Sequence, residues 1–263
     1  MSAQDASACL LTIDIGNTNT VIGLYRGETL TAHWRITTDR ERMADEYAML
    51  LRAFFDHAGR SWREVSGAII ASVVPPLTGA WEELCQRYLG LRPLVVGRGI
   101  NVGVRLLMDN PAEVGADRIV NTLAAYRRYG GPCIVVDFGT ATTFDIVSST
   151  GDYLGGAIAP GLGISAEALT SRTAKLPRVE LTPPPHAIGK NTVHAMQSGI
   201  VLGYVGLVEG LVKRIQAEIP DGPAKVIATG GLGEVVARLT PVIEVVDPSL
   251  TLDGLRMIYE MNR

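Results

Sequence analysis

Two short stretches of this chain share a pattern that could bind phosphate groups. Residues 14–20 read Asp-Ile-Gly-Asn-Thr-Asn-Thr, and residues 137–143 read Asp-Phe-Gly-Thr-Ala-Thr-Thr. Glycine and other small residues leave backbone N–H groups open to a phosphate, and the carboxylate can hold a hydrated cation. Each stretch lies between apolar segments that are typical of the two strands of a hairpin. The repeat therefore predicts two related half-domains, each with one phosphate-binding loop.

Either stretch alone could be an ordinary glycine turn. A third loop, Thr229-Gly230-Gly231, also follows an apolar segment, and the three loops together favour phosphate binding. Other catalytic signatures are absent from the sequence. It has no Gly-x-x-x-x-Gly-Lys-Ser/Thr loop, no Gly-x-Gly-x-x-Gly turn, no Gly-x-Ser-x-Gly elbow and no paired His or Cys spacing for a metal.

A carboxylate and a guanidinium stand side by side at Asp117 and Arg118, shortly after Asn110-Pro111. Asn-Pro is typical of a helix N-cap and first turn, which predicts a helix from Pro111 to Tyr129. In the simplest interpretation Asp117 only offsets the positive end of the helix dipole. The alternative is that it performs acid–base chemistry.

The bulk composition excludes several classes of protein. The chain has 263 residues, enough for one large or two modest domains, with 47% hydrophobic residues, 19% charged residues and a net charge of −3. This charge argues against a large nucleic-acid-binding surface. The N-terminal residues lack the pattern of a signal peptide, and the longest apolar stretch, 199–212, is too short to span a membrane. The scattered cysteines indicate reduced, mostly buried thiols in a cytoplasmic protein.

The elements that must position these loops follow an α/β pattern. Apolar runs predict strands over residues 10–37 (two or three, with a turn at Gly27), 67–74, 93–96, 133–147, 155–159 and 225–228. Helical spacing predicts helices over 45–57, 77–89, 111–129, 192–219 and from about 252. This order is typical of mixed sheets flanked by helices. A long loop over 175–190 favours a binding role.

Four glycines recur at helical spacing in the long helix, at Gly199, Gly203, Gly206 and Gly210. They share one face, and glycine destabilises a helix, so another element should approach that face closely. The partner could belong to the same chain or be the equivalent helix of a second subunit. We favour the subunit interface.

Two Asp-x-Gly hairpins and a Gly-Gly loop resemble the acetate and sugar kinase, Hsp70 and actin superfamily, in which the hairpins grip phosphates and the Gly-Gly loop lies under adenosine. With Gly-Ala-Asp-Arg between the hairpins, the order of motifs resembles type III pantothenate kinase over nearly the whole chain. Three further segments match that family: residues 71–75 (Ala-Ser-Val-Val-Pro), 155–161 (Gly-Gly-Ala-Ile-Ala-Pro-Gly) and 173–177 (Thr-Ala-Lys-Leu-Pro).

The resemblance implies a duplicated actin-like ATPase fold, built from two ribonuclease H-like half-domains. The first would cover residues 1–112 and the second 113–263, with the C-terminal helix (about 250–263) packing back on the first. The implied activity is ATP-dependent phosphorylation of pantothenate to 4′-phosphopantothenate, the first step of coenzyme A biosynthesis. Implied cofactors are magnesium with ATP and a potassium or ammonium ion. The implied protein is a cytoplasmic homodimer that binds neither nucleic acid nor membrane.

The resemblance also implies roles for individual residues. Asp117 would be the general base, Asp137 would bind the monovalent cation, and Asp14 would lie near the magnesium. ATP would contact the first loop and one threonine of the second: Asp14, Ile15, Gly16, Asn17, Thr18, Asn19, Thr20, Val21 and Thr140. Pantothenate would contact Gly115, Ala116, Asp117, Arg118 and Thr192. For Arg118, a structural ion pair with Glu113 is the competing interpretation.

One position departs from the family pattern. Many members carry a tyrosine that contacts pantothenate where this chain has Met108, and a thioether cannot replace the hydroxyl. Two alternative functions stay open on the sequence alone. One is another small-molecule kinase of the same superfamily, such as a sugar kinase. The other is a non-catalytic accessory protein, which we expect to have lost Asp14, Asp117 or Asp137; all three are present.

Overall fold

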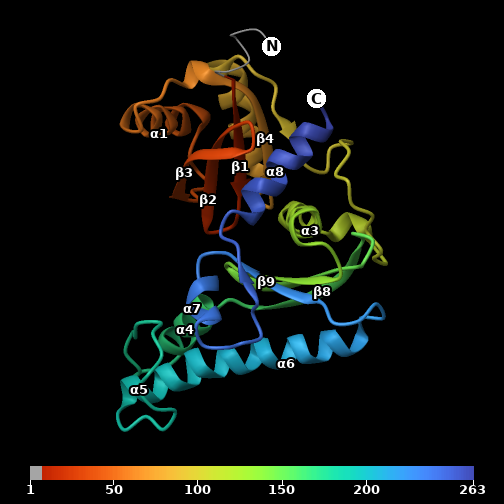
Figure 1. Cartoon of the computed structure of the whole chain (residues 1–263). Helices are drawn as coiled ribbons and strands as arrows, with labels where there is room; N and C mark the ends of the chain where they lie inside the picture. Colours follow the sequence, from red (N-terminus) through yellow and green to blue (C-terminus); the bar gives the residue numbers. More distant parts are fainter. Residues whose placement is uncertain (1–7) are drawn as a thin grey trace. The chain divides into compact units, whose positions relative to one another are not determined.

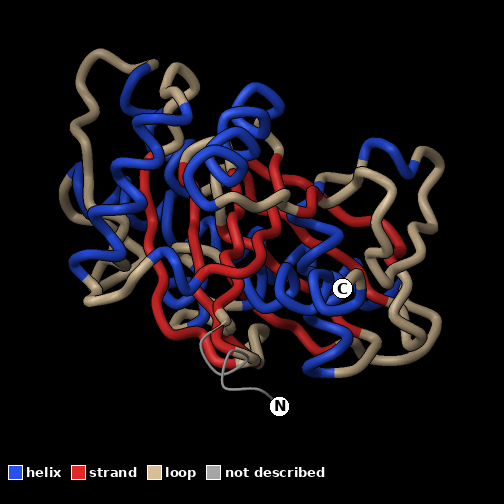
Figure 2. Tube along the Cα trace, turned by 90° about the horizontal axis from the view of Figure 1, so that it is seen from above, coloured by secondary structure: helices blue, strands red, loops and turns tan. Residues whose placement is uncertain are grey.

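The structure is a computed structural model that describes residues 8–263. The chain divides into two compact units. The first comprises residues up to Gly103, Ala112–Ala124 and Thr251–Arg263, and the second comprises Val104–Pro111 and Ala125–Leu250. Each unit contains a five-stranded mixed sheet with helices (Figures 1 and 2). The domain boundary expected after residue 112 stays a prediction.

The sheet of the first unit has the order β3-β2-β1-β4-β5. Its strands are β1 (Cys9–Ile15), β2 (Asn19–Arg26), β3 (Thr29–Thr37), β4 (Val65–Ser72) and β5 (Leu94–Val95). The first three form an antiparallel meander, and β4 and β5 add in parallel to β1. Gly27 makes the β2–β3 turn with φ of 58°, a conformation that glycine adopts without steric cost. The predicted strands at 10–37 are confirmed.

The first unit contains α1 (Ala44–His57), α2 (Pro75–Leu84), nearly all of α8 (Leu250–Met261) and the first part of α3 (Ala116–Tyr129), up to Ala124. A π-helical turn, Cys85–Leu89, extends α2. Apolar residues at helical spacing on α1 are buried in the core beside the sheet. Helix α8 is linked to β2 by a side-chain hydrogen bond. Tyr25 Oη of β2 donates to Asp253 Oδ1 of α8 at 2.8 Å. The C-terminal helix therefore packs on strands from the start of the chain.

The sheet of the second unit repeats this topology. Its strands are β6 (Cys133–Phe138), β7 (Ala141–Val147), β8 (Tyr153–Pro160), β9 (Lys225–Thr229) and β10 (Val245–Val246), in the order β10-β9-β6-β7-β8. Here too the first three strands form an antiparallel meander and the last two add in parallel. Each Asp-x-Gly motif therefore lies where the first strand of its meander ends, as the sequence repeat predicts.

The remaining helices are α4 (Leu162–Ser171), α5 (Thr192–Gln197), α6 (Gly203–Glu218) and α7 (Gly233–Ala237). The predicted start of α3 was wrong: Pro111–Glu113 form a separate 3₁₀ turn, and the α-helix begins at Ala116. Helix α4 was not predicted. A π-helical turn, Ser198–Leu202, joins α5 to α6 into one long rod (Figure 1).

This rod, Thr192–Glu218, is long and apolar enough by length and composition to cross a membrane. The buried side chains of α6, including Val205, Val208 and Val212, pack with strand residues in the core of the second unit. Core helices of this kind pass the same length and composition test. The packing therefore accounts for the apolar character of the helix.

Candidate active site

The first loop is a tight turn at the end of β1. Asp14 pairs with Val21 of β2 and with Ala71 of β4, and its side chain is half-buried. Gly16 N donates to Asn19 O at 3.0 Å, which closes the turn. Asn17, Thr18 and Asn19 are exposed. The loop thus presents backbone and small polar side chains to solvent with a carboxylate at its base, as a phosphate-binding loop requires.

A segment after β3 holds this loop in place. Thr38 N donates to Thr18 O at 2.9 Å, and Thr38 Oγ1 donates to Gly16 O at 2.7 Å. Arg40 Nη2 donates to Asn17 Oδ1 at 3.0 Å. Sequence reasoning missed these supports. The only signal was the polar run Thr-Thr-Asp-Arg that follows the predicted strands.

The Gly115–Arg118 segment lies beside the same end of the sheet. Val73, just past β4, donates its backbone N–H to Ile15 O at 3.1 Å. A Cβ at Gly115 would stand 3.5 Å from Val73 Cγ1. Val73 therefore lies between the first loop and the start of α3, with its backbone bonded to Ile15 and its side chain beside Gly115. Within the first unit the structure brings these two predicted site segments together.

The carboxylate of Asp117 folds back over the start of α3. Its Oδ1 accepts a hydrogen bond from Arg118 N at 2.9 Å, and a Cβ at Gly115 would stand only 2.5 Å from it. Residue 115 must therefore lack a side chain for this carboxylate position to exist. Burial raises the pKa of Asp117 above its ordinary value, while the Arg118 N–H and the Arg118 charge partly offset this rise.

The second loop turns at the end of β6. Asp137 pairs with Thr143 of β7 and Thr229 of β9, and Gly139 N donates to Ala141 O at 3.1 Å. Gly139 and Thr140 are exposed, while Asp137 is half-buried. This geometry matches that of the first loop and leaves the Thr140 hydroxyl at the surface of the unit.

The Gly-Gly loop packs directly against Asp137. Gly230 has φ of 84°, and a Cβ there would stand 2.5 Å from Asp137 Oδ1 and 2.7 Å from Phe138 N. Only glycine can adopt this backbone and leave the carboxylate in place. Two of the three predicted loops therefore meet in the second unit, around the Asp137 carboxylate.

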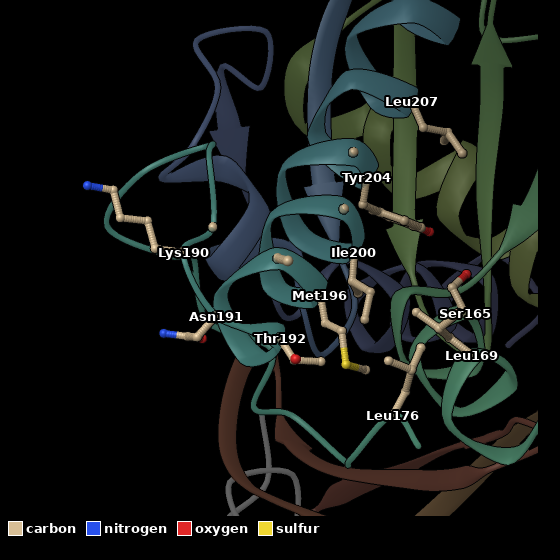
Figure 3. Close-up of a pocket in the computed structure, with 14 residues that line it drawn as sticks. Ser165, Leu169, Leu176, Lys190, Asn191, Thr192, Met196, Ile200, Tyr204 and Leu207 are labelled. Carbon is tan, nitrogen blue, oxygen red and sulfur yellow. The ribbon is translucent and has the colours of Figure 1, made fainter. Parts of the chain in front are cut away.

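Thr192 lies elsewhere in the second unit, at the rim of a cavity of about 810 Å³. It is the first residue of α5, and Asn191 caps that helix through a hydrogen bond from His194 N to Asn191 Oδ1 at 2.8 Å. Figure 3 shows Lys190, Asn191 and Thr192 at one end of the cavity. The rest of the lining is mainly apolar and comes from α4, the loop between α4 and α5, α5 itself, the π-helical turn and α6.

Met108 also belongs to the second unit and lies against β8. Its Sδ would stand 3.1 Å from a Cβ at Gly155. The thioether fills the space above a glycine of the Gly-Gly-Ala-Ile-Ala-Pro-Gly segment. The side chain at this position thus contacts the sheet by apolar packing.

The structure also bears on two other kinds of site, a metal-binding cluster and a cysteine nucleophile. Among residues 8–263, no three His, Cys, Asp or Glu side chains gather as a metal-binding group. The three cysteines are free and buried. Burial raises the pKa of both Cys85 and Cys133 to about 12, so neither thiol ionises near neutral pH. The raised pKa values argue against a thiolate nucleophile at these two positions.

Comparison with solved structures places this fold in a known class. A Campylobacter jejuni protein described as a Baf family transcriptional activator superposes with a TM-score of 0.61, at 21% identity, over 96% of this chain and 98% of that one. An activator of 2-hydroxyisocaproyl-CoA dehydratase from Clostridium difficile, solved with bound ADPNP, gives 0.57 at 13% identity, over 96% and 94%. The chain has the duplicated actin-like ATPase fold of the acetate and sugar kinases, as predicted.

Comparison of the sequence with known families identifies the family as well as the fold. Residues 10–214 match the family model for type III pantothenate kinase. The type III pantothenate kinase of Roseiflexus castenholzii is 60% identical over 97% of this chain and 99% of its own length. That of Moorella thermoacetica is 54% identical over 96% and 99%. The chain belongs to the type III pantothenate kinase family and is an enzyme of the kinase class.

Proposed function

We propose that this protein transfers the γ-phosphoryl group of ATP to pantothenate and produces 4′-phosphopantothenate for coenzyme A biosynthesis, with Asp117 as the general base. One observation carries the role of Asp117. Its carboxylate lies at the start of α3 beside Gly115, and Val73, which stands next to Gly115, donates its backbone N–H to Ile15 at the start of the first phosphate loop. A base aimed at an acceptor hydroxyl needs that proximity to the phosphate-binding backbone.

The environment of Asp117 also suits a base. Burial raises the pKa of this carboxyl, so its carboxylate form binds a proton more readily than that of a solvated aspartate. The Arg118 N–H donates to Oδ1 and orients the carboxylate, which would accept the proton of the pantothenate hydroxyl. Gly115 leaves room for the carboxylate in this position, because a Cβ at residue 115 would stand 2.5 Å from Asp117 Oδ1.

The first loop binds the phosphates of ATP. Its exposed residues, Asn17 to Asn19, present backbone N–H groups to the phosphates, and residues Ile15 and Val21 anchor its two ends in paired strands. Magnesium is usually held by one or two carboxylates together with substrate phosphates and water, which fits a single half-buried carboxylate at Asp14. When bound there with ATP, magnesium would neutralise phosphate charge.

The second loop binds the monovalent cation and contacts ATP. The Asp137 carboxylate is held next to the Gly230 backbone, and the exposed residue Thr140 would contact ATP. Potassium or ammonium is compatible with this donor set, since one carboxylate and neighbouring backbone carbonyls supply oxygen ligands without a cluster of acids. The Gly230–Gly231 turn lies under the adenosine in this proposal.

Pantothenate contacts the Gly115–Arg118 segment and Thr192. Arg118 would pair with the pantothenate carboxylate, because a guanidinium presents several donors in a geometry that matches a carboxylate. The hydroxyl of Thr192, exposed at the cavity rim, would donate to a polar group of the substrate. Met108 contributes apolar packing in place of the tyrosine hydroxyl found in many family members.

We also propose a cytoplasmic homodimer formed through α6 and the turn before it. Gly199, Gly203, Gly206 and Gly210 are exposed, and a Cβ at each would meet nothing within 4 Å among the described residues. Neighbouring apolar side chains, including Leu169 and Val193, are exposed as well. The stripe thus has no partner in the described part of the chain, and a second copy of the helix would supply one.

The decisive experiment measures ADP release and 4′-phosphopantothenate formation with pantothenate and ATP. It is run in potassium, ammonium and sodium at equal ionic strength. Product that depends on both substrates supports the activity, and potassium-dependent product supports the role of Asp137. If pantothenate yields no product in any salt while a hexose is phosphorylated, the protein is a different kinase of this fold. If neither acceptor is phosphorylated, the catalytic proposal is wrong.

A further inference from the structure

Tyr204, near the start of α6, links the long helix to the sheet of the second unit. Its side chain is buried, and its hydroxyl forms hydrogen bonds with Thr142 Oγ1 at 2.5 Å and with the carbonyl oxygen of Pro160 at 3.0 Å. The hydroxyl carries one proton, so it donates to Pro160 when the Thr142 hydroxyl donates to it. Burial raises the pKa of Tyr204, which keeps that proton on the phenol.

Both hydrogen-bond partners of Tyr204 lie next to the turn of the second loop, formed by Gly139 and Thr140 and called here the Thr140 turn. Thr142 follows that turn on β7 and pairs with Ala159, while Pro160 ends β8. The residue after Pro160, Gly161, donates its N–H to Thr140 O at 3.1 Å. A Cβ at Gly161 would stand only 2.3 Å from the same oxygen. The turn is therefore packed against the end of β8, which Tyr204 holds.

The aromatic ring of Tyr204 forms part of the cavity wall. The ring lines the cavity beside α4 and α6, and its hydroxyl points away from the helix axis in Figure 3. One side chain thus contacts the cavity through its ring and the strand ends through its hydroxyl. A buried tyrosine hydroxyl usually finds a hydrogen-bond partner, and the partners of Tyr204 are the ends of the two strands on either side of the exposed Thr140 turn.

We propose that Tyr204 is a positioning residue that fixes the Thr140 turn for ATP and for the monovalent cation. The inference rests on the proposed roles of Thr140 and Asp137. Thr140 and Gly139 are exposed, so their position depends on what holds the strand ends behind them. Without the phenol hydroxyl, the buried Thr142 hydroxyl loses a partner and Pro160 loses a donor. The turn then samples more conformations and binds its ligands less well.

The test replaces Tyr204 by phenylalanine, which keeps the ring in the cavity wall and removes only the hydroxyl. We expect the KM for ATP and the potassium concentration for half-maximal activation each to rise about 3- to 10-fold, because the strand ends behind the turn lose their hydrogen bonds to the phenol. The KM for pantothenate should change less than about 2-fold. Tyr25→Phe is the control, because it also removes the hydroxyl of a buried tyrosine, which donates to Asp253, but in the first unit.

A second variant separates positioning from folding. Thr142→Val removes the other hydroxyl, and in a double-mutant cycle with Tyr204→Phe the effects on the ATP constant should be strongly non-additive. Equal constants for Tyr204→Phe and the wild type would overturn the inference. So would a fall in melting temperature and kcat with both constants unchanged, which is the signature of a purely structural role.

Calorimetric titration with ATP keeps this test independent of the proposed activity. If the wild type does not phosphorylate pantothenate, the proposed function fails, but ATP binding still compares Tyr204→Phe with the wild type. Weaker ATP binding in Tyr204→Phe, with Tyr25→Phe unchanged, then supports the positioning role by itself. Identical ATP affinity in all three proteins refutes it whatever the acceptor proves to be.

Discussion

Replacement of Asp117 by asparagine tests the catalytic proposal most directly. The amide has nearly the shape of the carboxylate, and its Oδ1 can still accept the hydrogen bond from Arg118 N at 2.9 Å. Gly115 leaves room for it as it does for the native side chain. The substitution therefore removes charge and basicity and preserves the local fold. Any loss of turnover then reports on proton transfer.

We expect kcat to fall by about 10²- to 10⁴-fold, the usual contribution of a general base. This corresponds to about 3–5 kcal/mol of transition-state stabilisation. The KM for ATP should change little, because the phosphate-binding backbone of the first loop lies on the other side of Val73. Steady-state kinetics with a coupled ADP assay measures both quantities.

The same variant should be more stable than the wild type at neutral pH. Burial raises the pKa of Asp117 in the folded state, so the folded protein binds a proton more tightly than the unfolded chain. The ionised carboxylate consequently costs stability as the pH rises from about 4, the ordinary aspartate pKa, through the folded-state pKa. Asparagine avoids this cost. Urea unfolding should show no difference below about pH 4 and a constant advantage for Asp117→Asn above the folded-state pKa.

Asp152→Asn is the matched control with the opposite sign. Hydrogen bonds from Arg105 to both carboxylate oxygens, at 2.6 Å each, lower the pKa of Asp152. This carboxylate contributes stability above its unfolded pKa, and the contribution is lost as the pH falls through the folded pKa. Asp152→Asn should therefore be less stable at neutral pH, with little change in kcat.

Two results would refute the reasoning on Asp117. Near wild-type turnover in Asp117→Asn would remove this residue from the role of base. A large loss of turnover together with a lower free energy of unfolding at pH 7 would indicate that the carboxylate supports the fold instead. The predicted combination, in which the enzyme is more stable and inactive, is the pattern of a functional group held at a cost to stability.

Three further predictions concern glycines and the cation. Gly206→Ala should raise the free energy of unfolding of the isolated chain by about 1 kcal/mol, since alanine is the better helix former. The same variant should weaken dimerisation in sedimentation experiments. Unchanged association would count against a dimer through α6. Asp137→Asn should abolish the difference between potassium and sodium in the kinase assay, and a persistent potassium preference would place the cation elsewhere. Gly230→Ala should raise the KM for ATP or prevent folding, because a Cβ would stand 2.5 Å from Asp137 Oδ1, whereas Gly222→Ala, at a positive φ with open space, is the control for backbone strain alone.

The sequence predicted the parts of the fold that have strong local signals. The repeated Asp-x-Gly motif gave the two meanders and the location of each loop, because a strand–turn–strand pattern depends on neighbouring residues. The start of α3 was predicted wrongly, since Asn110-Pro111 has the chemistry of a helix start but forms a separate 3₁₀ turn. Helix α4 was missed because its segment, 162–171, is short, rich in small residues and carries little helical periodicity.

The supports of the two loops could not be read from the repeat. Thr38 and Arg40 hold the first loop from the end of β3, whereas Gly230, Gly161 and Tyr204 surround the second. These contacts join residues far apart in the chain, and no local pattern encodes them. Sequence motifs therefore located the candidate ligand-binding atoms, and only the tertiary structure shows what restricts their motion.

This difference in support bears on how a duplicated fold can acquire two functions. Equivalent loops begin with the same topology, but the first is held near the surface by the half-buried Thr38 and the exposed Arg40, and the second is held by close backbone contacts and a buried phenol. A surface support tolerates adjustment as phosphates of different charge bind and leave. A buried one keeps the Asp137 oxygens and their neighbours at fixed separations, as selection of an ion by size requires. The proposed division of labour, phosphate binding by the first loop and cation binding by the second, thus follows from packing outside the repeat.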